Sequence, residues 1–216
     1  MIYLILERFY KTAIKQMPQR DISVTLGDAK TRLSDHLKEQ TKTQHQMLEK
    51  QIIPLIKAIR ITKDYSDLLM YFYTFFGGLE LLVDGALHTA CLPDYLQRRK
   101  ISLLSNDLHA MDVPVQPFAN GKDLPTIGSH LQALGAMYVM EGSTLGGQHI
   151  SKMINDQINQ VTALAFFNAY KSETQNMWTA FKSAIDEMLL DSSEEAVVIK
   201  AANDTFTRFS AWLTHN

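Results

Sequence analysis

The stretch YSDLLMYFYTFFGGLELLVDGALHTA, residues 65–90, has the apolar spacing of a long helix that lies in a protein core. Thr62 or Asp64 can begin this helix, because either side chain can accept a hydrogen bond from a free N–H group of the first turn. Pro93 is predicted to end it. Large apolar residues recur three or four positions apart, on one helical face, at Leu68, Tyr71, Phe72, Phe75, Leu79, Leu82 and Ala86.

Helical patterns also cover most of the chain from about residue 31 onward. Ser34 and Asp35 can cap a helix that runs to about residue 50. An apolar face continues past Pro54, which predicts a break there followed by a short helix. Further helices are predicted over residues 94–111, 126–141, onward through a glycine-containing stretch to about 158, 162–190 and 193–213.

The clearest loop is DVPVQPFANGKDLP, residues 112–125, which holds three of the six prolines. The sustained alternation of Val, Ile and Thr that is typical of strands is absent from the sequence. The pattern therefore predicts an all-α bundle of seven or eight helices. Residues 31–216 are expected to form this single domain, and residues 1–30 an N-terminal extension whose structure the pattern does not define.

Composition limits the class of protein. Of the 216 residues, 46% are hydrophobic and 20% charged, which is enough apolar material for a large core. The formal charge of −2 offers no basic surface for nucleic acid. The single cysteine, Cys91, excludes an internal disulfide and fits a reducing cytoplasm. The apolar run in MIYLILERFYK is too short for a signal peptide or a membrane span, so a soluble cytoplasmic protein without a membrane partner is expected.

The stretch YVMEGSTLGGQH, residues 138–149, places three glycines inside a helical pattern. Each glycine within a helix costs about 1 kcal/mol relative to alanine, so Gly142, Gly146 and Gly147 need a reason. Close packing of two helices is one explanation. Another is a flat ligand against the helix backbone, with the hydroxyls of Ser143 and Thr144 available to orient water beside it.

If the flat ligand is haem, its iron needs an axial side chain such as histidine. Among the seven histidines, His45 has the most informative neighbours. Lys38 lies seven positions earlier, nearly on the same face of a continuous helix, and Glu49 lies one turn later. This arrangement suits an iron-binding imidazole next to a cation for a haem propionate. An ordinary surface or core histidine would fit the same pattern.

Three segments together resemble the haem oxygenase family. LKEQTKTQH, residues 37–45, resembles the family's proximal helix, which ends in the axial histidine. EGSTLGGQ, residues 141–148, resembles the kinked distal helix of the bacterial branch. FFNAYKSETQNMWTAFKSAID, residues 166–186, resembles a third bacterial signature. The segments occur in the family's order, so the resemblance implies the haem-oxygenase-like helical fold with a kinked distal helix.

The resemblance implies a role for each matching residue on the proximal side. His45 is expected to ligate the haem iron, and Lys38 to contact a propionate. Glu49 occupies a family acidic position near the proximal pocket. These three residues are therefore the expected proximal part of the haem site.

On the distal side, the resemblance implies that Gly142 and Gly146 let the helix backbone lie over the porphyrin, with Gly147 beside them. Gly142, Ser143 and Gly146 are the expected catalytic wall. Animal enzymes carry an aspartate where Ser143 stands, and serine agrees with the bacterial pattern. Lys171 replaces a glycine that is common in the family, which puts the shape of this loop in doubt.

Family membership would imply oxidative opening of haem to biliverdin, carbon monoxide and ferrous iron. Haem would be both cofactor and substrate, and O₂ the oxidant. The chain shows no flavin motif and too few cysteines for an iron–sulfur cluster, so electrons are expected from a ferredoxin, a flavodoxin or an NADPH-dependent reductase. The sequence leaves open whether the reaction serves iron acquisition or bilin supply to a photoreceptor.

Other functions of the same fold are compatible with parts of the sequence. A haem carrier or sensor without turnover would also keep His45. A di-iron protein would need Glu and His ligands at i,i+3 spacing on facing helices, and this paired pattern is not found. A thiaminase-like enzyme would need a nucleophilic cysteine, but Cys91 lacks a supporting motif.

Overall fold

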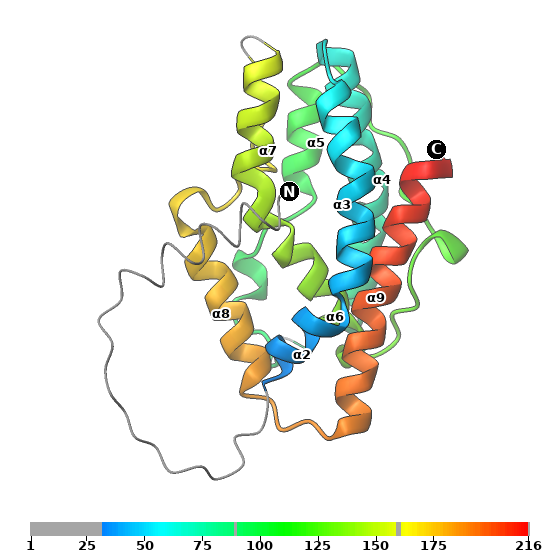
Figure 1. Cartoon of the computed structure of the whole chain (residues 1–216), viewed down its shortest axis with the longest axis vertical. Coiled ribbons are helices and arrows are strands. Elements are labelled where there is room, and N and C mark those ends of the chain that lie inside the picture. Colours follow the sequence, from blue (N-terminus) through cyan, green and yellow to red (C-terminus); the bar gives the residue numbers. More distant parts are fainter. Residues whose placement is uncertain (1–31, 89, 159–160, 216) are drawn as a thin grey trace. The chain divides into compact units, whose positions relative to one another are not determined.

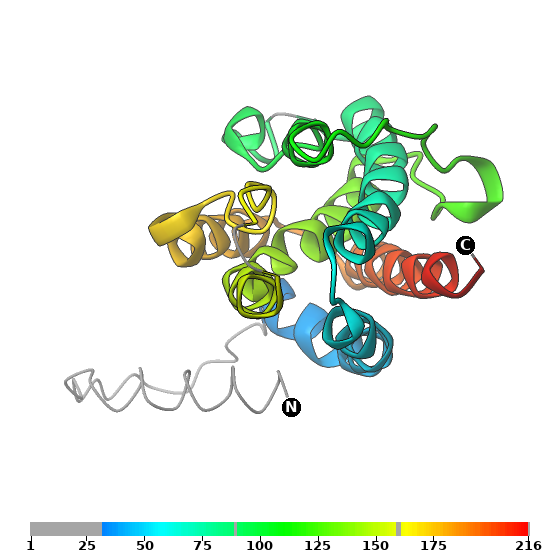
Figure 2. The same cartoon turned by 90° about the horizontal axis from the view of Figure 1, so that it is seen from above.

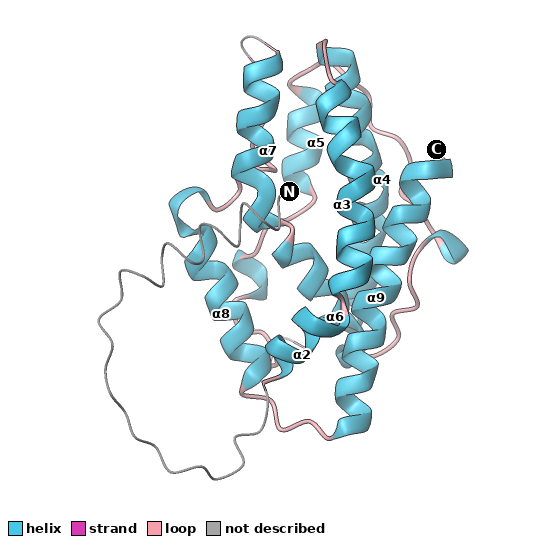
Figure 3. Cartoon of the chain, viewed as in Figure 1, coloured by secondary structure: helices cyan, strands magenta, loops and turns pink. Residues whose placement is uncertain are grey.

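The computed structural model describes residues 32–88, 90–158 and 161–215, so the predicted extension over residues 1–30 lies outside the described residues. Within these ranges the chain is helical and contains no strand, as Figures 1 and 3 show. The α-helices are α2 (Leu33–Gln40), α3 (Lys42–Ala58), α4 (Thr62–Ala86), α5 (Ser102–His109), α6 (His130–Gly142), α7 (Thr144–Gln157), α8 (Thr174–Asp186) and α9 (Ser192–His215). Short 3₁₀ turns are η1 (Tyr95–Gln97), η2 (Gly121–Asp123) and η3 (Lys171–Glu173).

The long apolar helix predicted from residues 65–90 is α4, and it starts where the sequence placed it. The carboxylate of Asp64 accepts the backbone N–H groups of Arg60 at 2.8 Å and Ile61 at 3.2 Å. The length and apolarity of α4 would also permit a membrane span, but 67% of its most apolar window is buried within the bundle. Such burial is typical of the central helix of a soluble protein.

Helix α9 packs along α6 and also contacts α3 and α4. The view from above shows α9 (red) beside this group, with α8 (orange) on the far side of α6 (Figure 2). Gly135 permits the closest approach, because a Cβ there would lie 2.3 Å from the carbonyl oxygen of Val198 on α9. This contact fixes α6 against the core, and it thereby also fixes the position of the residues that follow Gly142.

The break predicted at Pro54 is wrong, since α3 runs through this residue to Ala58. Lys50, whose carbonyl would normally bond the missing N–H of residue 54, is exposed, so water can hydrate that oxygen. The helix breaks instead at Thr41, between α2 and α3. At this turn the carbonyl of Leu37 accepts two hydrogen bonds from Thr41, one from the hydroxyl at 2.7 Å and one from the backbone N–H at 3.0 Å.

Two other predicted helices are shorter than expected. The helix predicted over residues 94–111 is only η1 and α5, because the chain between them is extended at Arg98. The helix predicted over residues 162–190 begins only at Thr174, in α8. In both cases side chains of the non-helical segment contact the region around the end of α6, described below.

Candidate functional site

The kink that the resemblance implies for the distal helix is present as a break between α6 and α7 at Ser143. Hydroxyl groups bond the carbonyls that the break leaves without helical partners. Ser143 Oγ donates to the carbonyl of Met140 at 2.7 Å, and Thr144 Oγ1 donates to the carbonyl of Glu141 at 2.6 Å. The serine and threonine after Gly142 therefore stabilise the local shape of the backbone.

The three glycines at the break differ in their surroundings. A Cβ at Gly147 would lie 2.1 Å from the carbonyl oxygen of Phe167, so packing against that loop alone requires glycine. A Cβ at Gly142 would make only ordinary contact with the Trp178 ring, at 3.7 Å. A Cβ at Gly146 would meet nothing within 4 Å in the described part of the chain. Packing inside the protein explains Gly147 and leaves Gly146 unexplained.

His45 lies in the first turn of α3, with its side chain 40% exposed and therefore accessible to a ligand. Its ring makes an edge contact with Phe206 of α9, with the ring centroids 5.5 Å apart. Its Nε2 is 3.9 Å from Glu49 Oε1, too long for a hydrogen bond but within range of a charge interaction. The helical spacing thus brings Glu49 next to His45, as expected.

The helices that carry His45 and the glycines contact each other. Arg60, just beyond α3, donates from Nη1 to Oε1 of Gln157 at the end of α7, at 3.4 Å. In Figure 1 both helices run upward, and His45 and Gly146 belong to the lower parts of α3 and α7. These two residues therefore lie toward the same end of neighbouring helices.

Lys38 is exposed on α2, and the break at Thr41 separates it from the helix of His45. The argument that a continuous helix would put Lys38 and His45 on one face is therefore wrong. Their relative placement depends on the turn at Thr41, because α2 and α3 have different directions in Figure 1.

A buried polar network, missed by the sequence reasoning, lies behind the break. Arg98 Nη1 is 2.6 Å from Glu141 Oε2, and the same guanidinium bonds Asp94 through Nε at 2.9 Å and Nη2 at 2.7 Å. The hydroxyl of Tyr170 lies 3.1 Å from both carboxylate oxygens of Glu141. This geometry gives Glu141 a structural role, since both of its carboxylate oxygens are engaged and the residue is 2% exposed.

Arg99 is the other arginine that the helix pattern concealed. Its Nη2 donates to the carbonyl of Met140 at 2.5 Å and to Ser143 Oγ at 2.6 Å. Its guanidinium carbon lies 4.1 Å from the ring centroid of Phe166. Burial lowers the pKa of Arg99, while Glu141 is the strongest opposing influence. Two adjacent arginines in a helical pattern were the available sequence signal for this buried network. Only the fold shows that both side chains point into the protein.

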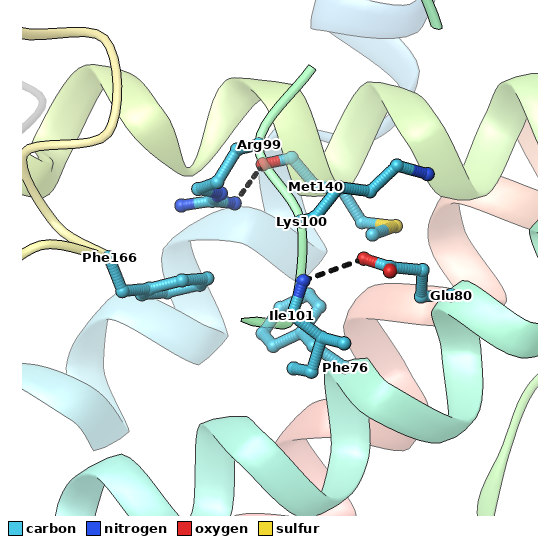
Figure 4. A pocket seen from close by; sticks show the side chains of 7 residues that line it. All are labelled: Phe76, Glu80, Arg99, Lys100, Ile101, Met140 and Phe166. Atoms are coloured by element: carbon cyan, nitrogen blue, oxygen red, sulfur yellow. Dashed lines mark hydrogen bonds between the residues drawn. The ribbon is translucent and has the colours of Figure 1, made fainter. Parts of the chain in front are cut away.

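A small pocket adjoins Arg99 (Figure 4). It measures about 10 Å³, roughly the space of one water molecule. Glu80 faces it, and burial raises the pKa of this carboxyl group, although the N–H of Ile101, 2.9 Å away, opposes the shift. The pocket is lined by Phe76, Glu80, Arg99, Lys100, Ile101, Met140 and Phe166.

The backbone conformation at Lys171 explains why glycine is common at this position in the family that the sequence resembles. Lys171 has a φ of 46°, in the left-handed region where glycine is least strained. Its carbonyl accepts a hydrogen bond from Gln148 Nε2 on α7 at 2.5 Å. The loop keeps the glycine-type conformation although lysine occupies the position.

Comparison with known proteins identifies the family. The family model described as Heme oxygenase matches residues 31–215. The chain belongs to the haem oxygenase family. This membership confirms the predicted family, the assignment as a haem oxygenase and its enzyme class.

Individual relatives agree with the family and the fold. A haem oxygenase of Xanthomonas campestris pv. campestris (strain 8004) is 26% identical over 150 residues, which cover 69% of this chain and 88% of the relative. The NO- and CO-bound haem oxygenase of Neisseria meningitidis has a TM-score of 0.69 at 20% identity, over 84% of this chain and 90% of that one.

The haem oxygenase of Leptospira interrogans also has a TM-score of 0.69, at 17% identity, over 86% of this chain and all of the other (100%). Haem oxygenase-1 of Synechocystis, in complex with haem, has a TM-score of 0.58 at 17% identity, over 85% and 91% of the two chains. At these identities the solved structures establish the all-α fold of the family.

Proposed function

We propose that the protein opens haem oxidatively to biliverdin and releases carbon monoxide and ferrous iron, with O₂ as oxidant. The observation that carries this proposal is the contrast between Gly146 and Gly147. Packing requires glycine at 147, but in the described part of the chain nothing lies near a Cβ at 146. Since glycine is unfavourable in a helix, a flat ligand against the backbone supplies the missing reason.

On the proximal side, His45 fits a role as the axial ligand of the haem iron. Its imidazole is accessible and braced by Phe206. Histidines that bind metals usually donate their other ring N–H to a carboxylate or carbonyl. Glu49 is the nearby carboxylate for that bond, and a small movement of either side chain would form it. Lys38, exposed on α2, provides a cation for a propionate.

On the distal side, Gly142, Ser143 and Gly146 form a wall of backbone and one hydroxyl group. Bound haem supplies the oxidative chemistry, and the chain supplies position and electrostatics. Glu141 is not available as an acid above the ring, because Arg98 and Tyr170 engage its carboxylate. Proton delivery therefore depends on water next to the small residues of the wall.

Electrons come from an external donor, of the ferredoxin, flavodoxin or NADPH-dependent reductase type. The residues described by the structure contain no group of three or more His, Cys, Asp or Glu side chains that could hold a metal ion, which gives the di-iron alternative no support among them. We propose a cytoplasmic location, which fits the single free cysteine. Both iron acquisition and bilin supply to a photoreceptor remain compatible with this chemistry.

The test is an optical titration of the full chain with hemin, followed by ascorbate or a reductase system in air. His45→Ala is the test variant, and His109→Ala is the control, because His109 is exposed on α5 and its ring contacts the hydroxyl of Ser105 on the same helix. We expect a Soret band that needs His45, followed by a biliverdin spectrum. Stable binding without ring opening would favour a carrier or sensor, and no specific binding would refute the proposal.

A further inference from the structure

The hydroxyl group of Ser143 has a defined orientation in the break between α6 and α7. The carbonyl oxygen of Met140, 2.7 Å away, can only accept a hydrogen bond, so Ser143 must donate its proton there. The guanidinium of Arg99, 2.6 Å away, can only donate, so Ser143 must accept from it. One lone pair of Oγ is left for a further partner.

Arg99 is held rigidly in the position that fixes this orientation. It is 8% exposed, and its guanidinium lies over the ring of Phe166. The backbone N–H of Arg99 donates to the hydroxyl of Tyr170 at 2.6 Å. The extended backbone at Arg98 lets both arginines enter the core from one short segment. Figure 4 shows the Arg99 guanidinium between Phe166 and the Met140 carbonyl.

Ser143 lies next to Gly142 and near Gly146, the residues that the proposed function places against the haem. Ser143 is partly exposed, and it precedes Gly146 by three positions, the spacing of neighbours on one helical face. The surroundings of Gly146 are open in the described part of the chain. A water molecule there can donate a hydrogen bond to Ser143 but cannot receive one from it.

We propose that Arg99 is a positioning residue that makes Ser143 a hydrogen-bond acceptor, and not a proton donor, for water on the distal side of the haem. This inference rests on the proposed function. Arg99 acts through Ser143 and through the Met140 carbonyl, and it does not touch the haem itself. The serine at the position of the animal aspartate then anchors water in one orientation without supplying a proton.

The test measures the pH midpoint of the acid–alkaline transition in the visible spectrum of the ferric haem complex. An acceptor on the distal side favours the protonated form of the water on the ferric haem, so Ser143→Ala should lower the midpoint. The expected shift is about 0.4 to 1 pH unit, the size of one net hydrogen bond. If Ser143 were a donor, its loss would raise the midpoint.

Arg99→Met, Arg99→Lys and the double variant Ser143→Ala/Arg99→Met complete the experiment. If Arg99 acts through Ser143, then Arg99→Met lowers the midpoint and adds nothing to Ser143→Ala in the double variant. Arg99→Lys, which keeps a buried donor, should restore most of the wild-type midpoint. Other titratable groups around the break are unchanged in these variants, namely Asp94, Arg98, Glu141, Tyr170, Glu80 and Lys100.

A raised or unchanged midpoint in Ser143→Ala would overturn the proposal, as would additive shifts in the double variant. If Arg99→Met does not fold, the sign of the shift in Ser143→Ala and the behaviour of Arg99→Lys decide the question. Failure of the proposed function would look different, because the wild-type chain would then form no haem complex that depends on His45.

Discussion

Substitution of Gly146 by alanine should move protein stability and haem affinity in opposite directions. In the free protein the new methyl group meets nothing within 4 Å in the described part of the chain. Alanine is favoured over glycine in a helix by up to about 1 kcal/mol, so the free energy of unfolding should rise by up to that amount. For a chain of this size, this corresponds to a melting temperature higher by about 2 to 4 °C.

The same methyl group should weaken haem binding. If the porphyrin lies against the backbone at residue 146, a Cβ there forces the ring or the helix to move. Overpacking by one carbon atom typically costs about 1 to 3 kcal/mol, which corresponds to an affinity lower by about 5- to 150-fold. The assay is a pair of measurements on one preparation, thermal unfolding of the haem-free protein and a hemin titration.

Gly85→Ala provides the matched control. Gly85 is an exposed residue in the last turn of α4, as Gly146 lies in the first turn of α7, and a Cβ there also meets nothing within 4 Å. Its substitution should raise stability by a similar amount and leave hemin affinity unchanged. If Gly146→Ala were more stable and bound hemin as tightly as wild type, the reasoning that glycine serves a flat ligand would be refuted.

Three further substitutions test the description of the region around the break. Lys171→Gly should raise the free energy of unfolding in urea by about 1 kcal/mol, because it relieves a left-handed backbone at φ 46°; a decrease would mean that the lysine side chain stabilises the loop. Gly147→Ala should lower it by at least about 1 to 3 kcal/mol, since the Cβ would overlap the Phe167 carbonyl, and an unchanged midpoint of urea unfolding would contradict the close approach. Burial raises the pKa of Glu80 in the folded state, so the folded protein keeps this carboxyl group protonated to a higher pH than the unfolded chain does. The free energy of unfolding of the wild type should therefore fall as the pH rises from about 4.5 through that higher pKa. Glu80→Gln should lack this loss. If the free energy of unfolding changed by the same amount between pH 4.5 and pH 7 in both proteins, a raised pKa of Glu80 would be refuted.

The sequence by itself determined the helical class, the kink of the distal helix and the identity of the family. These features depend on local properties that neighbouring residues express directly: apolar spacing in residues 65–90, the cost of glycine in a helix, and the short motifs around His45 and Gly142. The adjacency of His45 and Glu49 follows in the same way, because a helix brings residues four apart together.

The tertiary structure alone decided how the break is supported and which glycine is needed for packing. Arg98 and Arg99 lie about 40 residues before Glu141 and Ser143, so no periodic pattern could pair them. The same limit explains the wrong prediction of a helix over residues 94–111, since the backbone N–H groups of Arg99 and Ile101 bond the side chains of Tyr170 and Glu80 instead of helical carbonyls. Gly146 and Gly147 cannot be distinguished in the sequence, and only the position of the Phe167 carbonyl shows that packing requires glycine at 147. Local preferences determine where a helix can end, but contacts between distant segments determine which side chains surround that end.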